Sequence, residues 1–199
     1  MGREIELKIP LTDSQYAYIF SVIYGKEKIQ GFFFDASRIS KIEKKDEYYS
    51  RYSTREESRK NGEPQVIRIR CENDSKAFFC IKRKVIENGI ELNSENETFV
   101  ENAEVIRDFL MLSGYSKFFE KQKNAISSYC SAPGLLNSVF HLELEIVNNL
   151  KYMEVEVTEE TEAADKVRKA LEKFVIAFGL EPSSKDSRSW MQILGQSVK

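Results

Sequence analysis

Charged and apolar residues alternate along six short segments of the chain, at residues 4–8, 68–70, 81–84, 121–123, 143–145 and 154–156. Side chains two residues apart point to the same face of a β-strand, so each segment predicts a strand with a charged stripe on one face. The opposite face of each strand is apolar. A single stripe of this kind is ordinarily the solvent-facing side of a sheet whose other side covers a core.

Apolar residues at helical spacing predict four helices along the chain. Thr12 and Asp13 are expected to cap the first helix, and Gly25 to end it. Each of these helices has one apolar face, which suits it to cover the outside of a sheet. The other three are expected at residues 103–112, at about residues 162–178 and around Trp190.

Aromatic and polar stretches predict further strands and a loop. Residues 32–34 and 48–54 are rich in aromatic side chains and are expected to form strands joined by a lysine-rich connection. The polar residues 55–64 are expected to form a loop.

The clearest hairpin joins residues 139–147 to residues 150–157 through a turn at Asn148 and Asn149. The sequence shows no repeat, low-complexity tract or linker. Residues 1–199 are therefore expected to form one domain of the α+β class, a mainly antiparallel sheet with peripheral helices.

The charged stripes are segregated by sign. The acidic stripes contain Glu4 and Glu6, Glu143 and Glu145, and Glu154 and Glu156. The basic stripes contain Arg68 and Arg70, Lys82 and Lys84, and Lys121 and Lys123. Like charges on one face repel each other, and a solvent-facing sheet would avoid this by mixing them. A sheet that closes into a barrel, with its charged face inward and helices outside, accounts for the pattern, although any one stripe fits either arrangement.

The composition argues against polymers and membranes as partners. The 199-residue chain has a net charge of −2 with 31% charged residues, so it has no overall positive field for nucleic acid or a lipid surface. Its three cysteines lack metal-ligand spacing, which suits a reducing compartment. We expect a cytoplasmic protein, because no apolar signal stretch or membrane-spanning segment is evident.

Acidic and basic stripes on one inward face predict a site for a polyanion and its metal ions. A triphosphate carries about four negative charges, so several lysines and arginines must approach it from different directions. Paired carboxylates on neighbouring strands need cations between them, and Mg²⁺ or Mn²⁺ takes oxygen ligands of this kind. Such ions stabilise the charge that develops in phosphoryl or nucleotidyl transfer.

The segment Glu4-Ile5-Glu6-Leu7-Lys8 resembles the N-terminal Glu-x-Glu-x-Lys signature of the CYTH superfamily, the triphosphate tunnel metalloenzymes. Similar segments follow in order at residues 67–70, 81–82, 120–123, 145 and 152–156. The last part of the chain, at residues 178–180 and 187–195, is most similar to bacterial class IV adenylyl cyclases. The resemblance implies a closed eight-stranded antiparallel β-barrel, open as a tunnel, with two divalent-metal positions. It also implies a homodimer.

The resemblance further implies roles for individual residues. The metal ligands for Mg²⁺ or Mn²⁺ would be Glu4, Glu6, Glu145, Glu154 and Glu156. The residues that bind the triphosphate of ATP or another small molecule would be Lys8, Arg68, Arg70, Lys82, Lys121 and Lys123. The catalytic residues among them would be Lys8, Arg70, Lys82 and Lys123.

Several positions depart from the family pattern. Asn93 stands where an arginine is usual, which removes one phosphate contact, and Lys123 keeps the charge but not the forked geometry of a frequent arginine. Residues 25–46 form a longer segment than in compact cyclases.

His141 lacks a visible nucleophile partner and is expected to be a hydrogen-bonded barrel histidine. Trp190 is expected to be a core residue.

These features favour a metal-dependent enzyme similar to class IV adenylyl cyclases, which convert ATP into cyclic AMP and pyrophosphate. Hydrolysis of inorganic triphosphate or thiamine triphosphate is the alternative reaction, because the same cage serves both and only the position of the nucleophile differs. A module that binds polyphosphate or nucleotides without catalysis is the third reading.

Overall fold

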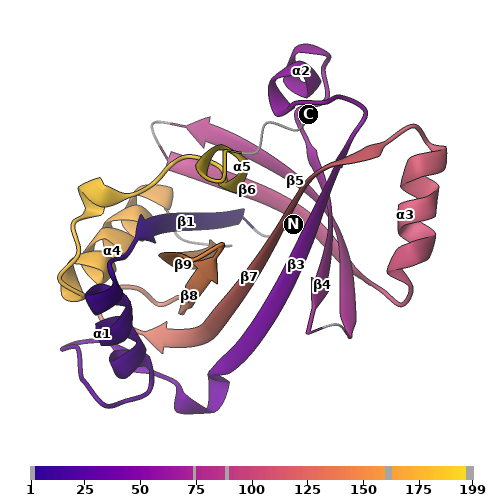
Figure 1. Ribbon diagram of the computed structural model, residues 1–199. Coiled ribbons are helices and arrows are strands. Elements are labelled where there is room, and N and C mark those ends of the chain that lie inside the picture. The colour runs from indigo at the N-terminus through magenta and orange to yellow at the C-terminus, as the bar shows by residue number, and fades with distance from the viewer. Residues whose placement is uncertain (1–2, 74, 88–89, 160–162, 196–199) are drawn as a thin grey trace.

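The computed structural model describes residues 3–73, 75–87, 90–159 and 163–195, with side chains for residues 5–73, 75–83, 94–157 and 163–195 (Figure 1). The strands are β1 (Arg3–Pro10), β2 (Phe33–Phe34), β3 (Ser40–Ser50), β4 (Val66–Glu72), β5 (Lys76–Glu87), β6 (Ile90–Val100), β7 (Ser116–Ser131), β8 (Phe140–Val147) and β9 (Leu150–Glu159). The helices are α1 (Asp13–Ile23), α2 (Arg55–Lys60), α3 (Ala103–Leu112), α4 (Ala164–Ala177) and α5 (Trp190–Ile193), with 3₁₀ turns η1 (Ala36–Arg38) and η2 (Pro182–Ser184). None of the helices described is long and apolar enough to cross a membrane.

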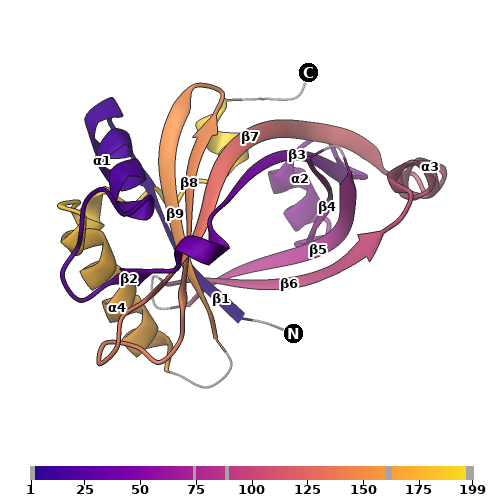
Figure 2. The ribbon, with the colours of Figure 1, turned by 90° about the horizontal axis from the view of Figure 1, so that it is seen from below.

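Eight strands form one antiparallel sheet that curls round on itself. Neighbouring strands follow the order β7-β3-β4-β5-β6-β1-β9-β8, and β8 pairs again with β7, so the pairing passes through all eight and returns to the first. The contact between β1 and β6 is short and joins residues 3–5 to residues 92–94. Figure 2 shows β3 to β6 arching away from β1, β8 and β9. The predicted eight-stranded antiparallel sheet with peripheral helices is confirmed, and it is curled. The predicted closed barrel with an open tunnel stays a prediction.

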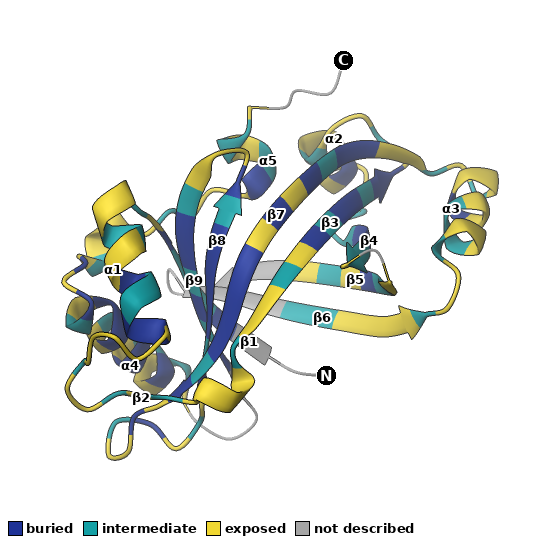
Figure 3. Ribbon diagram, turned by 60° about the horizontal axis from the view of Figure 1, so that its bottom comes forward, coloured by how far each residue is buried: buried dark blue, intermediate teal, exposed yellow. Residues whose placement is uncertain are grey.

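Helices α1 and α4 cover the outer face of the sheet along β1, β8 and β9. Ile5, Leu142 and Val155, which alternate with the charged residues of their strands, are buried there with Ile19 of α1 and Phe174 of α4. Figure 3 shows long buried stretches on β7, β8 and β9 near these helices. Burial of each such side chain contributes about 1.5–3 kcal/mol, so this packing keeps the apolar face outward and the charged face inward.

Two smaller clusters lie elsewhere on the sheet. On its other half, Leu110 of α3 packs against Tyr49 and Ile69. At the start of α5, Trp190 is buried against Phe119 and Tyr152, in agreement with its expected place in a core. The C-terminal segment therefore packs onto the sheet through an aromatic contact.

The segment from residue 35 to residue 64 differs from its prediction. The expected lysine-rich connection is itself part of β3, and the strand expected at residues 48–54 ends at Ser50. Residues 55–64, expected as a loop, contain helix α2, because the Thr54 hydroxyl accepts a hydrogen bond from the Glu57 amide at 3.1 Å and caps the first turn.

The other predicted elements agree more closely with the structure. The β8–β9 hairpin is confirmed, and Asn148 and Asn149 adopt φ angles of 47° and 68°, as a two-residue hairpin turn with positive φ at both positions requires. The expected start of the long helix near Glu162 falls outside the described residues, and α4 begins at Ala164.

Candidate functional site

Many of the charged side chains described on the strands face the inside of the curled sheet, and several of them are buried there. In register, Glu143 on β8 lies opposite Glu154 on β9, and Glu154 lies opposite Lys8 on β1. On another pair of adjacent strands, Asp46 on β3 lies opposite Lys121 on β7. Asp46 is 0% exposed, Lys121 5% and Glu143 6%, so these groups belong to a buried ionic network and not to a solvent-facing surface. Buried charges must be paired, and the network consists of such pairs.

Lys123 occupies the centre of an acidic cluster formed by Glu143, Glu145 and Glu154. Its Nζ lies 2.7 Å from Glu143 Oε2, 2.6 Å from Glu145 Oε2 and 3.3 Å from Glu154 Oε2. Lys44 Nζ adds a second ammonium 2.5 Å from Glu143 Oε1. Sequence reasoning placed Lys123 with the phosphate-binding cations, whereas the structure brings it among the predicted metal ligands Glu145 and Glu154.

The pKa values of these carboxyl groups are pushed apart. Burial, together with the charge of Glu154, raises the pKa of Glu145 to about 8. Burial also opposes ionisation of Glu154, but Lys123 and Lys121 outweigh it and lower the pKa of Glu154 to about 2. Lys123 and Lys44 outweigh burial in the same way at Glu143 and hold its pKa well below the usual range. Buried carboxyls with opposed pKa shifts are typical of functional sites.

This acidic cluster fits a divalent cation. One ligand atom from each of Glu143, Glu145 and Glu154 lies within 4.8 Å of the others, which is close enough for the three carboxylates to share one ion. Both oxygens of Glu145 are buried and accept no hydrogen bond from the described residues, although Oε2 makes an ion pair with Lys123. Buried acceptors of this kind need a partner, and carboxylate oxygens are the ligands that Mg²⁺ and Mn²⁺ prefer.

A second group of charges joins β3, β4 and β7. Arg70 donates from Nε to Asp46 Oδ1 at 2.7 Å and from Nη2 to Asp46 Oδ2 at 3.0 Å. Lys121 Nζ lies 3.5 Å from the same carboxylate. Burial opposes the ionisation of Asp46, but Arg70 and Lys121 keep its pKa well below the usual range. Burial lowers the pKa of Lys121 to about 8. Asp46 thus holds two of the predicted triphosphate-binding cations side by side.

A third group lies between β4, β5 and β6. Arg68 Nη2 lies 2.9 Å from Glu97 Oε2 and 3.3 Å from Glu95 Oε2, and Lys82 Nζ lies 2.5 Å from Glu95 Oε1. Burial opposes the charge of Glu95, but Lys82 and Arg68 lower its pKa to about 2. These contacts bring two more of the predicted triphosphate-binding cations into the interior.

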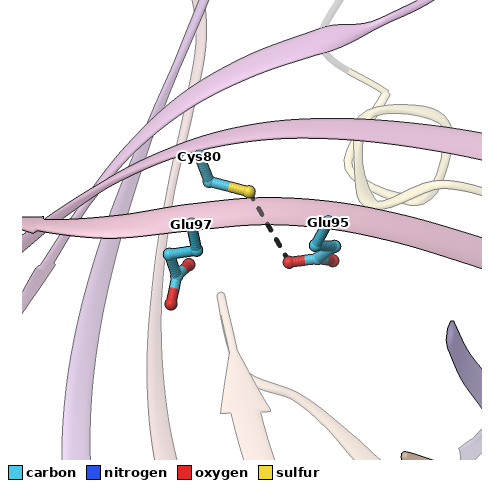
Figure 4. A group of neighbouring side chains, drawn as sticks. All are labelled: Cys80, Glu95 and Glu97. Carbon is cyan, nitrogen blue, oxygen red and sulfur yellow. Dashed lines mark hydrogen bonds between the residues drawn. The ribbon is translucent and has the colours of Figure 1, made fainter. Parts of the chain in front are cut away.

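Cys80 lies beside the same two glutamates. Its thiol donates to Glu95 Oε2 across 3.6 Å (Figure 4), and the three side chains are close enough to share a cation. Burial raises the pKa of the Cys80 thiol to about 12, so it stays protonated and is a poor ligand. Arg68 and Lys82 already neutralise the two carboxylates, so this cluster is a weaker candidate for a metal than the one around Glu145.

The C-terminal segment covers the end of the site at which Lys8 lies. Trp190 Nε1 donates to Glu154 Oε1 at 3.1 Å, and the ammonium groups of Lys8 and Lys121 each lie 5.1 Å from the centre of a Trp190 ring. Lys8 also donates to the carbonyl of Arg188. Two predicted triphosphate-binding lysines therefore contact one indole.

The predicted ligands on β1 lie only partly within the described side chains. The side chain of Glu4 falls outside them. Glu6 is described and half-buried, and it lies opposite Glu156 in the strand register. Burial lowers the pKa of Lys82, but Glu6 and Glu95 more than reverse this and raise it, so Glu6 faces the interior near Lys82.

Glu156 contacts His141, whose Nε2 lies 3.9 Å from Glu143 Oε1 at the side of the three-carboxylate cluster. His141 Nδ1 lies 2.7 Å from Glu156 Oε1, its Nε2 lies 2.8 Å from the Ser127 hydroxyl, and its ring stacks on Tyr129 with centroids 4.7 Å apart. The expected hydrogen-bonded barrel histidine is confirmed. Because its Oε1 is engaged with His141, Glu156 is a less available metal ligand than Glu145.

Sequence reasoning missed Asp46 and Lys44, and it gave no role to Glu143. Lys44 and Asp46 lie in a run of five charged residues, 43–47, so no apolar residue alternates with them as in the recognised stripes. The sequence therefore gave no period-two signal at this point, and its many lysines favoured a connection over a strand. Glu143 was recognised in an acidic stripe, and only the fold shows that it shares Lys123 with Glu145.

Comparison with solved structures shows that this arrangement of strands occurs in other proteins. A proposed adenylate cyclase from Vibrio parahaemolyticus superposes with a TM-score of 0.67 and 15% sequence identity over 97% of this chain and 98% of that one. A proposed adenylyl cyclase from Hippeastrum, described as having a dominant triphosphatase activity, superposes with a TM-score of 0.63 and 13% identity over 98% and 95%. The PH1819 protein from Pyrococcus horikoshii gives a TM-score of 0.69 and 22% identity over 96% and 97%.

No protein-family model and no curated protein sequence matches the chain. At these levels of identity the structural likeness establishes the fold, over nearly the full length of each chain compared. The chain has the fold shared by these proposed cyclases, and the CYTH-like fold predicted from its sequence is confirmed.

Proposed function

We propose that this protein is a metal-dependent enzyme that acts on a triphosphate, with a class IV adenylyl cyclase-like reaction as the first candidate. The proposal rests on one buried hydrogen-bond donor and one buried acceptor that lack partners within the same ionic network. Arg68 Nε is a buried donor without a hydrogen bond among the described residues, and Glu145 Oε1 is a buried acceptor without one. A donor of this kind suits an anion and such an acceptor suits a cation, so a metal–triphosphate complex satisfies both.

The triphosphate would be bound by cations from four strands. They are Lys8 on β1, Arg70 and Arg68 on β4, Lys82 on β5, and Lys121 and Lys123 on β7, with Asp46 on β3 orienting two of them. Arginines bind phosphate oxygens through a planar fork and lysines through a point charge, so together they suit an extended polyanion. All of these cations except Lys8 are described in ion pairs with carboxylates, and phosphate oxygens would take over the role of those carboxylates on binding.

Glu145 and Glu154, with Glu143, would hold a divalent ion, which when bound supplies charge neutralisation at the phosphoryl oxygens. Glu6 would extend this acidic side along β1. In a cyclase reaction the 3′-oxygen of ATP attacks the α-phosphorus, and pyrophosphate leaves. In a triphosphatase reaction water attacks the terminal phosphorus, the bond from that phosphorus to the bridging oxygen breaks, and the rest of the substrate leaves as a diphosphate while orthophosphate forms. Lys8, Arg70, Lys82 and Lys123 would stabilise the negative charge in either case.

Hydrolysis of inorganic or thiamine triphosphate is the second candidate. The charged network of this protein could bind the triphosphate group alone, without a nucleoside. The Hippeastrum structure of the same fold is described as having a dominant triphosphatase activity. Inorganic triphosphate is therefore a substrate to be tested beside ATP. The homodimer expected from the sequence resemblance stays a prediction.

Product analysis separates the candidates. The purified protein is incubated with ATP, tripolyphosphate or thiamine triphosphate in the presence of Mg²⁺ or Mn²⁺. Cyclic AMP with pyrophosphate identifies a cyclase, and orthophosphate identifies a triphosphatase. Glu145→Gln should abolish either activity, whereas Glu104→Gln, a change at an exposed carboxylate on α3, should leave it intact. If the protein binds these compounds but converts none of them with either metal, the result would support a module that binds polyphosphate or nucleotides without catalysis.

A further inference from the structure

The ammonium of Lys123 lies among the same three carboxylates that fit a divalent ion. The side chain is 3% exposed, and its Nζ is within 3.3 Å of one oxygen from each of Glu143, Glu145 and Glu154. No other lysine in the described part of the chain makes ion pairs with all three. The inference that follows rests on the proposed function, because it concerns the metal and triphosphate of that site.

Lys123 satisfies this cluster only in part. The three carboxylates can carry three negative charges, whereas the ammonium groups of Lys123 and Lys44 supply two positive ones, and Lys44 contacts only Glu143 within the cluster. Glu145 Oε1 is buried and has neither a hydrogen bond nor an ion pair among the described residues, whereas Oε2 is paired with Lys123. A divalent ion brings twice the charge of an ammonium and binds the oxygens directly.

Lys123 also lies close to cations assigned to the phosphate. Lys121 stands two residues away on the same strand face, and its positive charge and that of Lys123 disfavour each other. Arg70 likewise opposes the charge of Lys123, although the three glutamates outweigh it. An ammonium released from the carboxylates therefore enters a group of cations that only an anion can stabilise.

We infer that Lys123 is the resident counter-cation of the Glu143–Glu145–Glu154 cluster, that a divalent ion displaces it, and that the released ammonium then binds the triphosphate. Metal and triphosphate then favour each other's binding, because each stabilises the state in which Lys123 has left the carboxylates. Before the ligands arrive, the same contacts keep three buried carboxylates from repelling one another.

The test measures Mn²⁺ affinity by electron paramagnetic resonance on protein without nucleotide or triphosphate. Lys123→Gln removes a cation that competes with the metal, so it should bind Mn²⁺ about tenfold more tightly than the unchanged protein. Lys123→Arg keeps the charge and should not gain affinity. Lys117→Gln, a control at an exposed lysine near the start of the same strand, should bind Mn²⁺ as before. Unchanged or weaker Mn²⁺ binding by Lys123→Gln would overturn the inference.

A second comparison keeps the inference testable if Lys123→Gln alone does not fold. Lys123→Gln combined with Glu143→Gln removes one charge of each sign and leaves the net charge of the cluster unchanged. It should bind Mn²⁺ about tenfold more tightly than Glu143→Gln alone. Equal affinities would contradict displacement. These outcomes do not depend on turnover, so a protein that binds Mn²⁺ as expected but converts no triphosphate would refute the proposed enzyme and leave this inference standing.

Discussion

Arg70 and Asp46 form a two-point ion pair between neighbouring strands, with donor–acceptor distances of 2.7 and 3.0 Å and no exposed surface on the aspartate. Two parallel hydrogen bonds fix the plane of the guanidinium. Lys121 shares the same carboxylate, so one buried acid orients two cations that we assign to the triphosphate. Asp46 is therefore a positioning residue for the site.

Asp46→Ala should destabilise the fold strongly. Removal of one partner of a buried ion pair leaves an uncompensated charge, and such changes cost about 3–5 kcal/mol. Urea unfolding followed by circular dichroism measures the loss. The double variant Asp46→Ala with Arg70→Met removes both charges and should recover part of it. A single variant as stable as the unchanged protein would show that Arg70 and Lys121 do not depend on Asp46.

Glu95 should make the stability depend on pH at the acidic end. Its pKa is lowered from 4.5 to about 2, because Lys82 and Arg68 outweigh burial. A depressed carboxyl pKa stabilises the fold above the unfolded value, and this contribution is lost as the pH falls from about 4.5 towards about 2. The loss amounts to at most about 3 kcal/mol. Unfolding free energies measured from pH 5 to pH 3 should therefore decline.

Glu95→Gln provides the comparison for this pH effect. The variant has no carboxyl group to protonate at that position, so its unfolding free energy should fall less steeply over the same pH range. Glu104→Gln, at a side chain that is 74% exposed, should keep the slope of the unchanged protein. If the unfolding free energy falls equally steeply with pH in all three proteins, another carboxyl group, for example that of Asp46 or Glu143, would be responsible for the acid sensitivity.

Trp190 should report on triphosphate binding. It is the one tryptophan of the chain, and two lysines assigned to the triphosphate each lie 5.1 Å from its ring. Tripolyphosphate should draw these ammonium groups away from the indole and shift its fluorescence. Titration without metal measures the change. Lys8→Gln should reduce its amplitude, and Lys117→Gln should preserve it. An emission spectrum that stays constant at saturating tripolyphosphate would contradict the prediction that the lysines beside Trp190 move to bind tripolyphosphate.

The alternation of charged and apolar residues was enough to predict the strands and their inward stripes. Period-two patterns are local, so residues 143–145 and 154–156 could be assigned to strands from the sequence. Lys44 and Asp46 lie in the continuous charged run of residues 43–47, which has no such alternation, so their strand could not be recognised in this way. Thr54 offered a cap for helix α2, and a polar helix of six residues has no apolar stripe by which to recognise it.

The partners within the site could not be predicted from the sequence. Lys123 and Glu145 lie on adjacent strands whose register depends on the whole β7–β8 pairing. The choice between phosphate and carboxylate as the partner of a lysine depends on which groups face it across the interior. The resemblance to class IV cyclases implied a phosphate role for Lys123, and the structure shows carboxylates around it.

Lys82→Ala should weaken triphosphate binding more than it weakens the fold. The Lys82 ammonium lies 2.5 Å from Glu95 and is one of the cations in the interior. When Lys82 is replaced, Arg68 still neutralises Glu95, so the fold keeps that ion pair. A hydrogen bond between charged groups contributes about 1.5–3 kcal/mol, so the dissociation constant for tripolyphosphate should rise about 10- to 100-fold.

Isothermal titration calorimetry with tripolyphosphate, without metal, measures this effect of Lys82→Ala. The matched control is Arg83→Ala, the next residue on β5, because its exposed side chain points to the opposite face of the strand. That variant should bind tripolyphosphate as the unchanged protein does. Equal affinities for the Lys82 and Arg83 variants would remove Lys82 from the site. Equal losses in both would instead point to a general electrostatic attraction, since a specific contact depends on the face of the strand and a diffuse field does not.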